Sequence, residues 1–225
     1  MKGNLIMKSS SYSGSALLFV LLFISSSVFA QDEPAPLRIS LFGGMALPQG
    51  DFSATSGEKG GYAKTGFGGM LELSNTLSER ANWVTSVALN VNSIDEATMT
   101  SQWGQGTITG GKYVTTWAMT GIGFESAASP TVRVYGVGQL GLLFSSFPDI
   151  TMFYGGQSIT QTTKMGTAFA FGFGAGLIIN KLNVGLRYYT GEPEYEQTAT
   201  YMGVTGTAKV KMPATVLQLM IGINF

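Results

Sequence analysis

Apolar and polar residues alternate along most of this chain. The clearest case is its last segment, where Leu217, Leu219, Ile221, Ile223 and Phe225 are separated by small, polar or flexible residues, apart from Met220. A period of two predicts a β-strand with one apolar face. A length of about ten residues suits a tilted strand that spans a membrane.

Seven earlier segments show the same strand character. They are residues 37–47, 62–74, 82–92, 112–126, 131–145, 166–179 and 182–190, and the eighth strand is expected from Lys209 to Phe225. No segment beyond the N-terminal apolar stretch keeps a period of 3.6, so we expect no helix there.

The connections between these segments alternate in length. Three are short, at 75–81, 127–130 and 180–181, and four are long, at 48–61, 93–111, 146–165 and 191–208. Short turns at one end and long loops at the other are typical of membrane barrels. The pattern therefore predicts an all-β fold, a membrane-spanning antiparallel up-and-down eight-stranded β-barrel, with both chain ends on the short-turn side.

The segment 166–179 indicates which face meets lipid. Phe169, Phe171 and Phe173 share one face, and they alternate with alanine and glycine at 168, 170, 172, 174 and 176 on the other. Small residues suit the crowded interior of a small barrel. A soluble secreted barrel that binds an apolar ligand, which is an alternative interpretation, would place its large apolar side chains inside.

The N-terminus has the pattern of a secretory signal. Basic Lys2 and Lys8 precede an apolar run at 16–24 and small residues up to Ala30. We expect a cleaved signal peptide at 1–30, a linker at 31–36 and the barrel at 37–225, with either Met1 or Met7 as the start.

Composition narrows the possible functions. Charged residues make up 12% of the chain, with 13 bases and 13 acids, so a nucleic-acid partner is not expected. There is no cysteine and no histidine. No histidine can act as a general base, and without either residue a transition-metal site is not expected. We therefore expect no cofactor and no enzyme activity.

The first strand carries a resemblance to a known group. Gly44, Pro48, Gly50 and Phe52 resemble the Gly-x-x-x-Pro-x-Gly-x-Phe end of the first strand in small eight-stranded outer-membrane proteins, such as opacity proteins and the OmpA transmembrane domain. The terminal Phe225 is similar to their C-terminal phenylalanine. The resemblance implies a bacterial outer-membrane location, periplasmic termini, extracellular long loops and recognition of the last strand by the barrel-assembly machinery.

Charged residues on the inward faces are the first candidate site. If the apolar faces meet lipid, the lumen receives Arg38, Glu72, Glu125, Arg133 and Arg187. Unpaired charges in a dry lumen are costly, so they must form pairs. We expect Glu72 and Glu125 to join Arg38 and Arg133 in a network that plugs the short-turn half, with Arg187 higher. The alternative is a narrow porin-like channel for small solutes.

The outer loops hold the remaining candidates. Lys112, Lys209 and Lys211 lie where strands re-enter the membrane, and they either contact lipopolysaccharide phosphates or extend their amines from the rim into water. An acidic run at 192–196 is either a solvated loop or a divalent-cation site.

Aromatic residues at the strand ends, Tyr113 among them, are expected to anchor the barrel at the membrane interfaces. The sequence as a whole predicts a structural or surface-interaction role, in which the long loops contact an unidentified surface ligand.

Overall fold

The computed structural model describes residues 37–57, 59–103, 106–201 and 204–225. The expected signal peptide at 1–30, the linker at 31–36 and the choice between Met1 and Met7 lie outside these residues. Among the residues that are described, no helix has the length and hydropathy that a membrane crossing requires.

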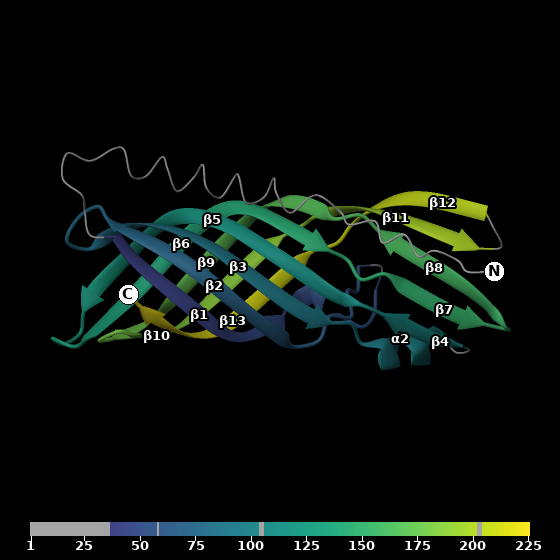
Figure 1. The fold of residues 1–225 in the computed structure, drawn as a ribbon, viewed down its shortest axis with the longest axis horizontal. Coiled ribbons are helices and arrows are strands. Elements are labelled where there is room, and N and C mark those ends of the chain that lie inside the picture. Colours follow the sequence, from purple (N-terminus) through teal and green to yellow (C-terminus); the bar gives the residue numbers. More distant parts are fainter. Residues whose placement is uncertain (1–36, 58, 104–105, 202–203) are drawn as a thin grey trace, which may run out of the picture. The chain divides into compact units, whose positions relative to one another are not determined.

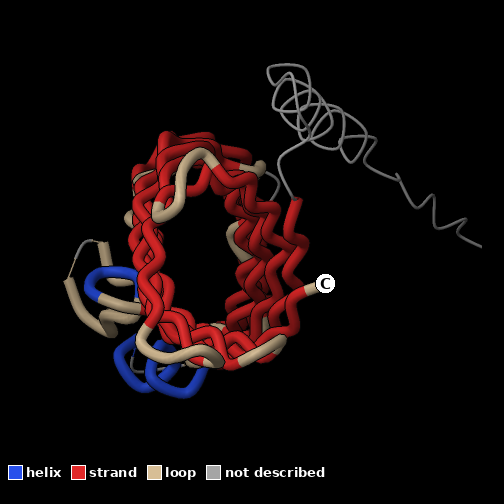
Figure 2. Tube along the Cα trace, turned by 90° about the vertical axis from the view of Figure 1, so that its left-hand side faces the viewer, coloured by secondary structure: helices blue, strands red, loops and turns tan. Residues whose placement is uncertain are grey.

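Eight antiparallel strands close into a barrel, which Figure 2 shows nearly end-on as a continuous ring. They are β1 (Leu37–Pro48), β2 (Gly66–Thr76), β3 (Ala81–Ser93), β5 (Lys112–Ala127), β6 (Val132–Ser146), β9 (Gly166–Ile179), β10 (Leu182–Gly191) and β13 (Ala214–Asn224). Each strand pairs with the preceding and following barrel strand, so the predicted up-and-down eight-stranded barrel is confirmed.

The last strand closes the barrel against the first. β13 pairs with β1 from Ser40 opposite Asn224 to Pro48 opposite Val216. Beyond the strand, the Phe225 amide donates to the Ile39 carbonyl at 2.8 Å. Closure pairs the backbone groups of every barrel strand on both sides, as a membrane interior requires.

The two faces of the wall differ as the alternation predicts. Large apolar side chains point outward and are exposed, for example Phe67 at 77% and Phe169 at 81%. Most inward positions are buried, and they include the largest enclosed side chains, Trp117 and Arg187. An exposed apolar wall of this kind is stable in lipid and would be unfavourable in water.

Five further strands extend the sheet beyond the long-connection end (Figure 1). They are β4 (Thr107–Gly110), β7 (Ile150–Tyr154), β8 (Gln157–Thr163), β11 (Glu194–Tyr201) and β12 (Val204–Lys211). They pair in the order β12–β11–β8–β7–β4, and we call them the outer sheet. The long connections therefore contain strands that the sequence analysis did not predict, because these strands lack alternating apolar residues.

Three sequence expectations about elements are wrong. The first is the absence of helices, since α2 (Glu96–Trp103) and the 3-10 turn η1 (Gly50–Phe52) lie in the long connections. The carboxylate of Asp95 caps α2 by accepting hydrogen bonds from the Thr98 amide and hydroxyl at 3.2 and 2.9 Å.

The other two errors concern where strands begin. Residues 209–225 are not one strand, because Met212 and Pro213 separate β12 from β13, and proline has no amide hydrogen to donate. β2 begins at Gly66 rather than at residue 62. The residue at 62 is Tyr62, which has φ of 52°, a left-handed conformation outside the strand region.

Candidate functional site

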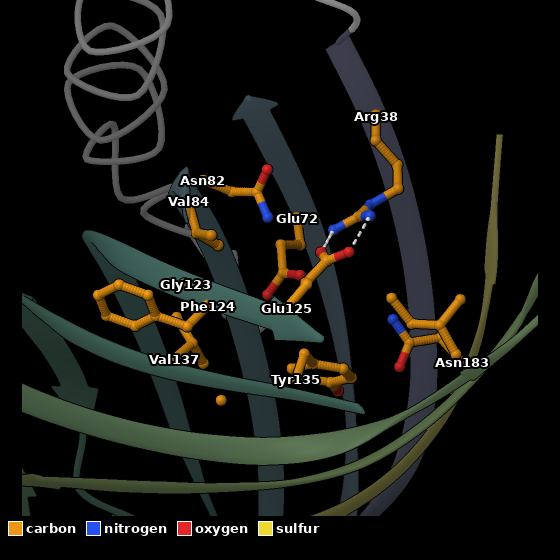
Figure 3. Close-up of a pocket in the computed structure, with 12 residues that line it drawn as sticks. Arg38, Glu72, Asn82, Val84, Gly123, Phe124, Glu125, Tyr135, Val137 and Asn183 are labelled. Carbon is orange, nitrogen blue, oxygen red and sulfur yellow. Dashed lines mark hydrogen bonds and ion pairs between the residues drawn. The ribbon is translucent and has the colours of Figure 1, made fainter. Parts of the chain in front are cut away.

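The barrel lumen is filled by side chains in successive layers, and the first lies at the short-turn end. Arg38 on β1 donates two hydrogen bonds to Glu125 on β5, one of them at 3.1 Å. Arg133 on β6 lies 3.3 Å from the same carboxylate. Figure 3 shows Arg38 and Glu125 pointing toward each other across the lumen. This layer joins three of the five predicted lumen charges.

The other two predicted charges form a separate pair. Glu72 accepts from Arg187 at 2.7 Å, and their side chains are only 6% and 2% exposed. The guanidinium carbon of Arg187 also lies 5.0 Å from the ring centre of Tyr135, a cation–π contact.

The expected network of Glu72 with Arg38 and Arg133 is therefore wrong. Arg38 lies opposite Ser74 in the strand register, and Glu72 is one inward position farther from the short-turn end. That step puts the Glu72 carboxylate at the height of Arg187, which β10 supplies from the other wall of the barrel.

Three successive inward glycines of β9 make room for large side chains. A Cβ added at Gly172 would lie 2.7 Å from the ring of Tyr189. Equivalent atoms at Gly174 and Gly176 would collide with Arg187 and with the Tyr135 hydroxyl. The small-residue face of this strand therefore provides the space that the middle layers occupy.

The next layer is aromatic and amide-rich. Trp117 and Tyr189 stack with ring centres 5.4 Å apart, and the Tyr189 hydroxyl lies 3.3 Å from the Met70 sulfur. Beside them, the Gln139 amide donates to the Ser86 hydroxyl at 3.1 Å. Buried polar groups need such partners, and these bonds fix the aromatic rings across the lumen.

A chain of four aromatic rings closes the long-connection end. Phe52 of η1 meets Tyr113 edge-on at 4.9 Å, Tyr113 meets Phe147 at 5.1 Å, and Phe147 meets Tyr195 at 5.6 Å. The Tyr195 hydroxyl donates to Ser145 at 2.6 Å, and burial raises the pKa of Tyr195 to about 12. Tyr113 is 1% exposed, so its expected place at the lipid interface is wrong.

A small cavity remains between the two ionic layers. Its volume is about 10 Å³, and Arg38, Glu72, Tyr135 and Asn183 line it (Figure 3). This is room for about one water molecule. Four nearby buried atoms lack a hydrogen-bond partner: Arg187 Nε and Nη1, Tyr135 Oη and Asn183 Oδ1. The short-turn half of the lumen is thus polar and tightly filled.

The acidic run at 192–196 is neutralised by lysines. Glu192 pairs with Lys59 at 2.9 Å, and Glu194 pairs with Lys209 at 2.9 Å. Glu196 pairs with Lys164 at 2.5 Å. Hydrogen bonds from these lysines, with their charge, hold the pKa of all three carboxylates below the usual glutamate value. Within the described residues no group of three or more acidic residues is arranged to hold a metal ion.

The three lysines considered for lipopolysaccharide contact lie at the rim of the long-connection end. Lys112 begins β5, Lys211 ends β12, and Lys209 is engaged with Glu194. The residues of the terminal pattern lie on the outer wall: Leu219, Ile221, Ile223 and Phe225 are exposed, and Leu217 is half-buried. A role for either set stays a prediction.

The neutral lumen residues were not predicted from the sequence. Tyr135, Tyr189 and Trp117 lie at the same strand parity as the charges Arg133, Arg187 and Glu125. Parity within a strand fixes the face, so this signal was present in the sequence. The sequence-based assignment of the lumen covered only the charged residues at inward positions.

No protein-family model matches the chain, and no curated protein matches it in sequence. Among solved structures, a major outer membrane protein of Thermus thermophilus matches with a TM-score of 0.53 and 12% identity, covering 84% of this chain and 99% of that chain. The attachment invasion locus protein Ail of Yersinia pestis matches with a TM-score of 0.42 and 16% identity, covering 84% and 97%. The Neisserial surface protein A matches with a TM-score of 0.44 and 10% identity, covering 84% of this chain and 95% of that chain.

At these identities, likeness establishes the fold alone, and the Thermus protein is the match that carries that argument. Its fold agrees with the closed eight-stranded sheet of this chain. The chain therefore has the fold of a small membrane-spanning outer-membrane β-barrel.

Proposed function

We propose that this protein resides in the bacterial outer membrane as a plugged barrel with a structural and surface-contact role and no catalytic activity. The supporting observation is the filled lumen. Buried ionic, aromatic and amide layers follow one another from Arg38 at one end to Tyr195 at the other. A barrel closed in this way holds its shape in the bilayer and presents its loops, but it leaves little room for a solute.

The proposed orientation places the long connections and the outer sheet outside the cell and both chain ends in the periplasm. Two points support this orientation. The polar outer sheet needs a large aqueous space, and outer-membrane barrels keep their short turns on the periplasmic side. In this orientation lipopolysaccharide surrounds the rim that carries Lys112, Lys209 and Lys211. The assembly machinery would engage the terminal strand that ends at Phe225, and a surface ligand would meet the loops.

Planar-bilayer recording tests the plug. Purified protein is expected to give no stable conductance of nanosiemens size. A double variant, Trp117→Gly with Tyr189→Gly, removes a stacked layer and is expected to raise conductance. Thr85→Val, on the outer wall, is the matched control. Stable channels from the unmodified protein would refute the plug.

A narrow channel for small solutes is the second candidate. The observation in its favour is the polar short-turn half, where Arg38, Glu72 and Glu125 line the small cavity. In the next layer, two nitrogens of the Arg187 guanidinium have no hydrogen-bond partner. If this candidate is correct, the unmodified protein conducts and Glu72→Gln changes its ion selectivity.

Tag accessibility on intact cells tests the orientation. An epitope inserted at the β7–β8 turn, between Gly155 and Gly156, is expected to bind antibody from outside. The same epitope in the 127–130 turn is expected to bind only after the membrane is broken. The opposite pattern would overturn the proposed orientation.

A further inference from the structure

Threonines form a row across the whole outer sheet. The register places Thr205 opposite Thr200, Thr200 opposite Thr160, Thr160 opposite Thr151 and Thr151 opposite Thr109. A second row, two residues nearer the barrel, is formed by Thr207, Thr198 and Thr162. We call these eight residues the threonine face. Its longer row spans five strands, or about 19 Å at the usual strand spacing.

Threonine favours strands, and cross-strand threonine pairs stabilise sheets. Contacts of this kind are present, at 3.2 Å between the hydroxyls of Thr200 and Thr205 and 3.3 Å between those of Thr198 and Thr207. Strand preference alone would place threonine on both faces. Across the five strands the reverse face instead carries one threonine, Thr163, and its exposed positions include Ala199, Tyr201, Val204, Gly206 and Ala208. The hydroxyls are therefore concentrated on one side.

The threonine face continues the outer wall of the barrel. β11 leaves β9 where Glu194 lies opposite Thr167, an outward and exposed position. Residues of the same parity, Thr198 and Thr200, point the same way. They lie four and six residues beyond Glu194, or about 13 and 20 Å along the strand. The face is thus directed sideways, just beyond the lipid-facing belt.

The chemistry of this face is suited to sugars. Each threonine hydroxyl both donates and accepts hydrogen bonds, as sugar hydroxyls do. Ion pairs of glutamate and lysine lie closer to the barrel and leave the two rows themselves uncharged. Phe153 lies on the same side, opposite Thr107 and Ser158, and is 51% exposed. An exposed aromatic ring beside hydroxyl groups provides a surface for the apolar side of a sugar ring.

We propose that the threonine face binds the oligosaccharide of the glycolipids that surround the barrel in its own leaflet. The position of the threonine face indicates this partner. A sideways face next to the lipid belt meets the headgroups of neighbouring lipids before it meets any molecule from outside. This inference rests on the proposed outward orientation of the long connections. It concerns sugar hydroxyls, and so it differs from a contact between lysines and lipid phosphates.

The test measures binding of oligosaccharide released from rough lipopolysaccharide, with the protein in phospholipid nanodiscs. The variant combines Thr160→Val, Thr200→Val and Thr205→Val, which keeps side-chain shape and strand preference but removes three hydroxyls. Each substitution removes the hydrogen bonds that one hydroxyl makes with the sugar, so binding by the triple variant is expected to weaken at least about tenfold. Phe153→Ala is expected to weaken it as well.

The matched control is Thr85→Val with Thr120→Val. These threonines form a hydroxyl pair at 3.2 Å on the lipid-facing wall, away from the outer sheet. The control should bind as the unmodified protein does. Unchanged heat-dependent gel migration of every variant shows that the barrel is folded.

Three results would overturn the proposal. They are no binding by the unmodified protein, equal binding by the triple valine variant, and binding that is lost only with Lys209→Gln, which would indicate phosphate recognition. The nanodisc measurement does not depend on orientation in the cell. Failure of the tag experiment therefore refutes the proposed orientation, while failure of oligosaccharide binding refutes only the threonine face.

Discussion

The buried pair of Glu72 and Arg187 gives the sharpest test of the lumen. Glu72→Gln removes the carboxylate charge and leaves the guanidinium of Arg187, which is 2% exposed, without its counter-charge. Removing one partner of a buried ion pair costs about 3–5 kcal/mol. The Arg187 Nε and Nη1 atoms already lack partners, so little remains to compensate the charge.

The double variant Glu72→Gln with Arg187→Met removes both charges and keeps most of the volume. Replacing both members of a buried pair is often close to neutral, so most of the lost stability should return. Arg133→Gln is the matched control. Arg133 is 45% exposed and 3.3 Å from Glu125, which places it among surface pairs worth about 0–1 kcal/mol.

Urea unfolding in lipid vesicles, followed by tryptophan fluorescence, measures all four proteins. Trp117 lies in the adjacent layer and reports loss of the lumen packing. Two results would refute the expected role of this pair: a cost of less than about 1 kcal/mol for Glu72→Gln, or a double variant that is no more stable than Glu72→Gln alone.

Three further outcomes are expected. Gly176→Ala should destabilise the barrel by about 1–3 kcal/mol in the same unfolding assay, because the new methyl group would collide with the Val184 carbonyl oxygen and lie 2.6 Å from the Tyr135 hydroxyl. Gly138→Ala, with nothing within 4 Å, should be neutral or stabilising, and equal effects would contradict the packing argument. Acid should loosen the outer sheet: the lowered pKa values of Glu192, Glu194 and Glu196 contribute stability that is present above the unfolded value of 4.5 and lost as pH falls through the folded values. Hydrogen exchange should then rise in residues 192–211 below pH 4.5 before it rises in the barrel, and a uniform rise would count against the lysine pairs. Deletion of Phe225 should lower the fraction of protein that reaches the heat-modifiable folded form in cells, while wild-type yield would refute an assembly role.

Strand parity explains which features could be predicted. Alternation of apolar and polar residues is a local property, so eight barrel strands and the inward set of Arg38, Glu72, Glu125, Arg133 and Arg187 followed from it directly. Loop lengths then fixed the up-and-down order. α2 and the outer strands were missed because they lack an apolar period, and their stability depends on pairing between loops that are distant in the sequence.

The sequence by itself determined the barrel, its lipid-facing wall and the identity of its lumen charges, since each depends on residue type and parity along one strand. Only the tertiary structure decided which charges pair. The stagger between neighbouring strands sets the height of each side chain, and it joined Glu72 to Arg187 rather than to Arg38. The same cross-strand register aligned threonines from three separate connections into one face. Side chains opposite one another in a sheet are in contact however far apart their segments lie along the chain, so this alignment cannot be deduced from one strand alone.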